Sequence, residues 1–141
     1  MTVRKVNSVW NGTLKEGNGK MNITGYSGPF TYASRFENGK GTNPEELVGA
    51  AQSGCFSMFL AALISGEGLT PESIETEADV TLGQLDGGPA ITKIKLTSVT
   101  KCEGLSQEKF TELAQAAKVK CPISRLFAGG TAEIELDAKL V

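Results

Sequence analysis

The alternation of hydrophobic and polar residues in the first forty positions predicts a meander of short strands. Hydrophobic runs there are short, and turns rich in glycine and asparagine separate them. Strands are expected over Val3–Trp10, Met21–Thr24 and Phe30–Ala33. The turns between them are expected at Asn11-Gly12, a strong hairpin signal, and at Gly17-Asn18-Gly19.

A long helix is predicted to begin near Asn43, where the sequence carries several helix-start signals. Asn43 is a favourable N-cap residue, Pro44 suits the first helical position, and Glu46 at N3 can pair with Asn43. Hydrophobic residues then recur at three- and four-residue spacing until Gly66. They include Val48, Ala51, Cys55, Met58 and Ala62, with Leu47, Ala50, Phe59 and Leu63 close by. The helix is apolar over much of its circumference and is therefore expected to be buried on more than one side.

The second half of the chain alternates between strand and helix patterns. A hydrophobic stripe beginning near Ser106 predicts a second helix, and Cys121-Pro122 predicts the start of a short third one. Strict alternation predicts three strands, Ile74–Leu82, Ile91–Lys101 and Thr131–Val141. Hairpin-rich strands with two substantial helices between them indicate an α+β domain rather than a series of βαβ units.

The length of the chain predicts one domain over residues 1–141. A chain of 141 residues that is 40% hydrophobic can form one ordinary core, and it contains no internal repeat or linker. Such a domain has difficulty covering a helix that is apolar nearly all round. We therefore expect an intertwined dimer, in which a second subunit covers the rest of the helix.

The charge pattern excludes several classes of partner. The net charge is −2 with both signs interspersed, so neither a nucleic acid nor a strongly charged partner is expected.

The longest apolar run, Cys55–Ile64, is too short to span a bilayer. The first residues lack the apolar stretch of a secretion signal. These observations predict a cytoplasmic protein without a membrane partner.

The chain contains no histidine, which restricts the chemistry open to its three cysteines. Cys–His and Ser–His catalysis are excluded, and the spacing of Cys55, Cys102 and Cys121 matches neither a metal site nor a secreted disulfide framework. Arginine, a carboxylate or a helix N-terminus must therefore activate any reactive thiol. No metal site is expected.

Each cysteine has more than one interpretation. Cys55 lies in the middle of the long apolar helix, where it is either a buried core thiol or a nucleophile held in place by the helix. Cys121, directly before a helix start, is either a cap or a thiolate stabilised by unpaired N–H groups. Cys102, at a strand end, has no such feature and is interpreted as incidental. Spacing alone does not show whether Cys55 and Cys121 meet.

Two charged residues near the start of the long helix are further candidates. Arg35 lies between aromatic residues in a predicted loop, where it is either solvated or part of a site. Glu45 at N2 is favourable for the helix dipole. Ten helical residues span about 15 Å, too far for Glu45 to act directly on Cys55 of the same chain. If both belong to one site, Glu45 is expected from an antiparallel partner helix.

Several segments closely resemble the osmotically inducible protein C branch of the OsmC/Ohr family. The resemblance covers nearly the whole chain and keeps the order of the elements. The matching segments are Arg35-Phe36-Glu37, Lys40–Leu47, Gly49–Ala51, Cys55–Met58, Thr70-Pro71, Ala90–Ile94 and Cys121–Ser124. The combination is specific, whereas a lone Cys-Pro or Asn-Pro-Glu-Glu is not.

The resemblance implies a fold with antiparallel sheets around two long central helices, in an intertwined homodimer with active sites at the subunit interface. It implies a thiol-dependent peroxidase that reduces organic hydroperoxides and, less well, hydrogen peroxide. A dithiol such as a lipoyl group would recycle the enzyme, and no cofactor is needed. The implied role is defence against oxidative and osmotic stress.

The resemblance also implies roles for four residues. Cys55 matches the peroxidatic cysteine, Cys121 the resolving cysteine, Arg35 the arginine that holds the thiolate, and Glu45 the carboxylate that orients the arginine. In this scheme Cys55 becomes a sulfenic acid, which condenses with Cys121 to a disulfide. The alternatives are a redox-sensing or ligand-binding module without turnover, and a structural protein with inert cysteines.

The chain differs from the family pattern in the residues around Cys55. Gln52-Ser53-Gly54 precedes Cys55 where relatives often carry a histidine and alanines, and Cys102 is additional. Gly54 is expected to loosen the packing behind the nucleophile. Phe56, Met58 and Phe59 are interpreted either as core residues or as a pocket for the organic part of a substrate.

Overall fold

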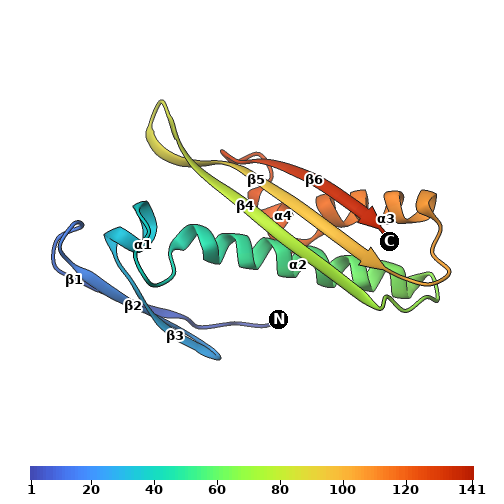
Figure 1. Ribbon diagram of the computed structural model, residues 1–141, viewed down its shortest axis with the longest axis horizontal. Coiled ribbons are helices and arrows are strands. Elements are labelled where there is room, and N and C mark those ends of the chain that lie inside the picture. Colours follow the sequence, from blue (N-terminus) through green and yellow to red (C-terminus); the bar gives the residue numbers. More distant parts are fainter. The chain divides into compact units, whose positions relative to one another are not determined.

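The computed structural model describes all residues, 1–141, and the chain divides into two compact units. The first unit is Met1–Leu47 and the second is Val48–Val141. The boundary falls within the long helix α2 (Pro44–Gly66), near its start (Figure 1). Each unit is described separately below.

The first unit contains an antiparallel meander in the order β1-β2-β3. Its strands are β1 (Asn7–Asn11), β2 (Asn18–Ile23) and β3 (Tyr26–Phe30). The predicted meander is confirmed, but both predicted turns differ. Asn11 pairs with Asn18 across a loop formed by residues 12–17, so Asn11-Gly12 is no two-residue hairpin and Asn18 belongs to a strand. The Trp10 indole N–H donates to the Gly12 carbonyl within this loop (3.1 Å), which stabilises the wider connection.

A short helix, α1 (Tyr32–Phe36), replaces the end of the predicted strand Phe30–Ala33. Thr31 and Ser34 form a capping box: the Ser34 N–H donates to Thr31 Oγ1 (3.1 Å), and the Thr31 N–H donates to Ser34 Oγ (2.9 Å). These bonds satisfy N–H groups at the helix start and stop the strand. Arg35 therefore lies on a helix rather than in a loop, which corrects the sequence prediction.

Helix α2 begins as its sequence predicts. The Glu46 N–H donates to Asn43 Oδ1 (2.8 Å), so Asn43 caps the helix. The Glu46 carboxylate accepts from the Thr42 hydroxyl (2.9 Å) instead of pairing back to Asn43. The Asn43 amide donates to the Ser34 carbonyl (3.0 Å), which ties the helix start to α1.

In the second unit, α2 has a buried face and an exposed apolar face. The residues with the smallest exposure follow a four-residue spacing: Gln52, Phe56, Leu60 and Ile64. Ala51, Met58 and Ala62 are exposed in the isolated chain, and Met58 is 77% exposed. By length and composition α2 as a whole could also cross a membrane, although the run Cys55–Ile64 alone is too short. A core helix passes the same test, and the hydrophobic residues of the buried face of α2 belong to the core.

The sheet of the second unit is mixed, with the strand order β4-β5-β6. Strand β4 (Ser73–Leu85) pairs antiparallel with β5 (Gly88–Lys101), and β5 pairs parallel with β6 (Glu133–Leu140). The predicted antiparallel pairing is found between β4 and β5, and β6 adds a parallel edge to this sheet. The chain reaches β6 through a crossover of two helices, which is the kind of connection that parallel neighbours need.

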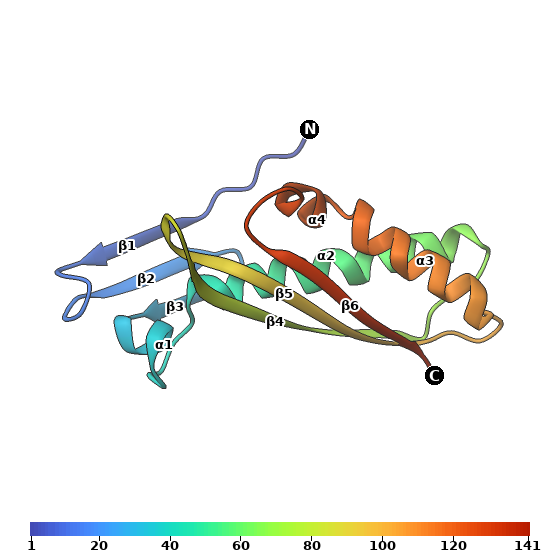
Figure 2. The same cartoon turned by 90° about the horizontal axis from the view of Figure 1, so that it is seen from above.

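The crossover consists of α3 (Gln107–Lys120) and α4 (Pro122–Phe127), both at predicted positions. Ser106 caps α3, its hydroxyl accepting from the Lys109 N–H (3.2 Å). Strands β4, β5 and β6 cross α2 obliquely in Figure 1 and lie next to it in Figure 2. The buried cluster joins α2, β5 and α3 through Phe56, Leu60, Ile64, Ile94, Leu96, Phe110, Leu113, Ala114 and Ala117, with Cys102 and Leu105.

Candidate functional site

Two of the three cysteines are neighbours in the second unit, and all three are reduced. Cys55 lies half-buried on α2, and Cys121 lies fully buried between α3 and α4. Burial raises the pKa of the Cys55 thiol, the backbone N–H of Ile123 acts in the opposite direction, and the neighbouring Cys121 thiol raises the pKa further. The spacing left open whether these sulfurs meet, and the fold brings them together.

Cys121 is the N-cap of α4, as its place before Pro122 predicts. The Ser124 N–H donates to Cys121 Sγ (3.4 Å), and the Cys121 thiol donates to Ser124 Oγ (3.1 Å). Ser124 is itself buried. A single residue of α4 therefore contacts the Cys121 sulfur with both its backbone and its side chain.

Gln52 on α2 binds Ser124, the residue that contacts the Cys121 sulfur. This role of Gln52 was not predicted from the sequence. The Gln52 side-chain N–H donates to Ser124 Oγ at 2.6 Å, and Gln52 is completely buried. Its side-chain oxygen has no hydrogen-bond partner. The available signal was a polar amide on the buried face of an otherwise apolar helix, one turn before Phe56. Buried polar groups of this kind usually serve a specific contact.

The first unit carries a second pair of candidates, Arg35 and Glu45. The guanidinium donates from Nη2 to Glu45 Oε1 (2.6 Å) and from Nε to Oε2 (3.1 Å), so the pair is bidentate. The Glu45 side chain is only 12% exposed and the Arg35 side chain 35%. The Arg35 guanidinium also lies over the Phe36 ring, 5.2 Å from its centroid. These contacts hold the guanidinium in one orientation.

Arg35 lines an aromatic cavity of about 400 Å³ within the first unit. Its other side chains come from the meander, α1 and the start of α2: Trp10, Leu14, Phe30, Thr31, Tyr32, Phe36 and Pro44. Such a cavity suits an apolar group placed beside a cation. Phe56, Met58 and Phe59, interpreted from the sequence as either core or pocket, do not line this cavity. Phe56 is instead core, Phe59 packs against the core, and Met58 is exposed.

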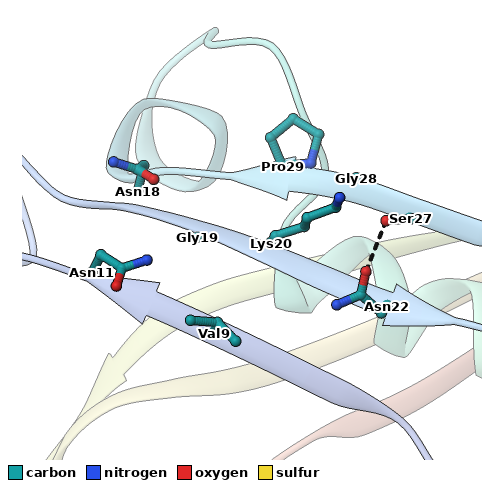
Figure 3. Close-up of a pocket in the computed structure, with 9 residues that line it drawn as sticks. All are labelled: Val9, Asn11, Asn18, Gly19, Lys20, Asn22, Ser27, Gly28 and Pro29. Atoms are coloured by element: carbon teal, nitrogen blue, oxygen red, sulfur yellow. Dashed lines mark hydrogen bonds between the residues drawn. The ribbon is translucent and has the colours of Figure 1, made fainter.

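A cavity of about 620 Å³ lies along the meander, between β1, β2 and β3 (Figure 3). Asparagine side chains and Lys20 line it, and the Ser27 hydroxyl donates to Asn22 Oδ1 (2.7 Å). Its lining residues include no cysteine, arginine or carboxylate. The structure contains no group of three or more side chains of the types that hold a metal ion. The thiol pair of the second unit and the arginine–glutamate pair of the first unit are the candidate functional groups, each within its own unit.

A family model described as "OsmC-like protein" matches residues 37–137. The chain belongs to the OsmC-like protein family. It is 43% identical to Peroxiredoxin OsmC of Escherichia coli in an alignment of 146 positions that covers 99% of each chain. It is 33% identical to the organic hydroperoxide resistance protein OhrB of Bacillus subtilis over 104 residues, or 73% of this chain and 74% of OhrB.

Solved OsmC-like structures share the fold. The crystal structure of OhrB of Bacillus subtilis superposes with a TM-score of 0.71 and 26% identity, covering 96% of this chain and 98% of OhrB. An OsmC-like protein from Mycoplasma pneumoniae superposes with a TM-score of 0.80 at 14% identity, covering 99% and 98% of the two chains. The α+β fold and the family resemblance seen in the sequence are thus confirmed.

Proposed function

We propose that this OsmC-like protein is a thiol-dependent peroxidase that reduces organic hydroperoxides, and hydrogen peroxide less well, in defence against oxidative and osmotic stress. The observation that carries the proposal is the reduced Cys55 thiol beside a second thiol, Cys121, in a chain without histidine. The names of the relatives support it, since one is a peroxiredoxin and another an organic hydroperoxide resistance protein. No cofactor takes part in the proposed reaction.

In the first step, the Cys55 thiolate attacks one oxygen of the hydroperoxide. An S–O bond forms, the O–O bond breaks, and the alkoxide takes a proton to leave as the alcohol. Because burial raises the pKa of Cys55, the thiolate needs a positive partner. We assign that role to Arg35, which also stabilises the charge on the departing oxygen. Glu45 orients the guanidinium through its bidentate contact.

In the second step, Cys121 attacks the Cys55 sulfenic acid. An S–S bond forms, the S–O bond breaks, and water leaves. A dithiol, of which a lipoyl group is one example, then reduces the disulfide and becomes oxidised itself. The aromatic cavity beside Arg35 supports an organic substrate, because its rings can pack against an alkyl or aryl group.

The active sites are proposed to lie at the interface of an intertwined homodimer. The helical spacing between Glu45 and Cys55 favours Glu45 of the partner subunit as the carboxylate of each site. The exposed face of α2 supports a helix–helix contact, since Ala51, Gly54 and Ala62 are small and Met58 protrudes. A Cβ built at Gly54 meets no atom within 4 Å in this chain, so Gly54 leaves room on that face rather than loosening the core.

Replacing Met58 with glutamate is expected to weaken the dimer, because a charge would be buried against the apolar α2 of the partner subunit. Sedimentation velocity should show a dimer for the wild-type protein and a dissociation constant raised about a hundredfold or more for Met58→Glu. The matched control is Val119→Glu on α3, also an exposed hydrophobic residue, which should remain dimeric. A wild-type protein that is monomeric at micromolar concentration would contradict the proposed dimer.

The two units are proposed to work as one OsmC-like domain over residues 1–141, since the family match crosses the boundary between them. We propose that the protein lies in the cytoplasm, where thiols such as Cys55 and Cys121 are kept reduced. Recovery of the protein from an oxidising compartment in cell fractionation would contradict this location. Neither a nucleic acid nor a membrane is a proposed partner.

Replacing Cys121 with serine is expected to stop the cycle after one oxidation. Mass spectrometry after one equivalent of cumene hydroperoxide should find Cys55 linked to Cys121 within a wild-type chain, and Cys55 as sulfenic or sulfinic acid in Cys121→Ser. With a lipoyl dithiol as reductant, steady-state turnover of Cys121→Ser should fall about tenfold or more. Cys102→Ser is the control and should behave as the wild type.

Three results would each point to an alternative to this proposal. Unchanged turnover in Cys121→Ser would remove Cys121 from the mechanism. A wild-type protein that is oxidised once, and that no dithiol returns to turnover, would be a redox sensor rather than a peroxidase. Thiols that remain reduced after exposure to hydroperoxide would indicate a structural role for both cysteines.

A further inference from the structure

A continuous chain of hydrogen bonds joins α2 to Cys121 through buried atoms. Gln52 Nε2 donates to Ser124 Oγ at 2.6 Å, and Ser124 Oγ lies 3.1 Å from Cys121 Sγ. Gln52 and Cys121 are 0% exposed and Ser124 is 4% exposed. Water therefore does not compete for these contacts, and the two hydrogen bonds determine where the Ser124 hydroxyl lies.

The presence of Gln52 on this face of α2 is not explained by packing. Its neighbours on the buried face, Phe56 and Leu60, are hydrophobic. The Gln52 side-chain oxygen is buried without a hydrogen-bond partner, which is unfavourable for folding. A hydrophobic residue would avoid this cost. What the glutamine provides, and a hydrophobic residue cannot, is an N–H directed at Ser124.

We propose that Ser124, held in place by Gln52, is a positioning residue for the resolving thiol Cys121. This inference rests on the proposed peroxidase function and concerns its second step. While Cys121 is a thiol, its S–H group donates to Ser124 Oγ. When that proton leaves, the Ser124 hydroxyl rotates and donates to the thiolate, a charge-assisted hydrogen bond. The Gln52 N–H occupies a lone pair of the same oxygen and directs the hydroxyl proton to the sulfur.

The step balances without any further reactant. Cys121 loses a proton and its thiolate attacks the sulfur of the Cys55 sulfenic acid. The S–S bond forms as the S–O bond breaks, and the departing oxygen takes up the proton released by Cys121 and leaves as water. Ser124 gains and loses no atom. The Ser124 hydroxyl orients the attacking Cys121 sulfur and stabilises the negative charge of the thiolate. The Ser124 backbone N–H, 3.4 Å from Cys121 Sγ, adds to this stabilisation.

The test measures the two steps separately in a single turnover. Reduced protein is mixed with one equivalent of cumene hydroperoxide, quenched at intervals, and analysed by mass spectrometry. The sulfenic acid is counted as its dimedone adduct and the Cys55–Cys121 disulfide directly. Ser124→Ala is expected to lower the rate of disulfide formation, relative to sulfenic acid formation, about tenfold or more. Gln52→Met, which keeps the volume but lacks the N–H, should change the ratio in the same direction.

Two further variants distinguish positioning from general loss of packing. Ser124→Thr retains the hydroxyl and should restore the ratio to within about threefold of the wild type. Ser98→Ala removes an equally buried hydroxyl, one that contacts Thr76 at 2.9 Å, and should leave the ratio unchanged. If Ser124→Ala fails to fold, as judged by circular dichroism, the test is made with Gln52→Met, which should slow disulfide formation where Ser124→Thr does not.

The possible failures are distinguishable. A Ser124→Ala protein that forms the disulfide within about twofold of the wild-type rate would overturn this inference alone. An equal slowing in Ser124→Ala and Ser98→Ala would also overturn it, because the effect would then be one of packing. A wild-type protein that forms neither sulfenic acid nor disulfide would refute the peroxidase proposal, and this inference with it.

Discussion

Replacing Cys55 with serine is expected to lower kcat/KM for cumene hydroperoxide by about a thousandfold or more, to the background rate. A serine hydroxyl remains protonated at neutral pH and cannot pass through a sulfenic acid, so neither step can occur. The measurement is peroxide consumption with a lipoyl dithiol as reductant. Circular dichroism should show the same fold, because sulfur and oxygen differ little in size at this half-buried position.

Cys102→Ser is the matched control for Cys55→Ser, since it makes the same chemical change at a more buried cysteine. It should keep full activity. A Cys55→Ser protein that retains more than about a hundredth of the wild-type activity would show that another group reduces the peroxide. Cys55 would then not be the nucleophile, and the proposed peroxidase mechanism would be refuted even though the relatives are named as peroxidases.

Replacing Arg35 with methionine is expected to lower kcat/KM about a hundredfold. Methionine retains much of the side-chain volume but loses the charge and the fork of N–H donors. Burial raises the pKa of Cys55, so without Arg35 the thiol should stay protonated to higher pH. Iodoacetamide alkylation of Cys55, measured from pH 6 to 10, should therefore rise at higher pH in Arg35→Met than in the wild type.

Conservative variants show which property of Arg35 matters. Arg35→Lys keeps a charge but loses the bidentate contact with Glu45, so it should recover only part of the activity. Glu45→Gln should reduce activity about tenfold, because the guanidinium would lose its charge-assisted contact. Arg4→Met, at an exposed position outside the helices and strands, is the control and should be fully active. Activity within about threefold of wild type in Arg35→Met would remove the guanidinium from the mechanism.

Elements with strong local signals were predictable from the sequence. The start of α2 follows from Asn43 and Pro44, because capping depends on residues within one turn. The three strands of the second unit follow from alternation, which is a property of each strand alone. Their pairing was not predictable, since β6 joins β5 in parallel only after the chain has crossed back through α3 and α4.

Short elements were less predictable, because few residues decide them. The hydrophobic run Phe30–Ala33 reads as a strand, but the Thr31–Ser34 capping box begins α1 within it. Asn11-Gly12 reads as a tight hairpin turn, but the pairing of Asn11 with Asn18 leaves a wider loop. In both places a few local hydrogen bonds outweigh the preference of the residue types for a strand or a tight turn.

The order and identity of the residues were enough to establish the family, the main elements and the limits on the chemistry. The absence of histidine restricts thiol activation, and the motifs around Cys55 and Cys121 carry the resemblance, because both depend only on which residues are present and in what order. Tertiary structure decided which side chains meet. It brought Cys121 beside Cys55, and it joined Gln52 to Ser124 across 72 positions of sequence. Such contacts depend on how α4 packs against α2. No local pattern in the sequence predicts that packing, because the residues involved are far apart in the chain.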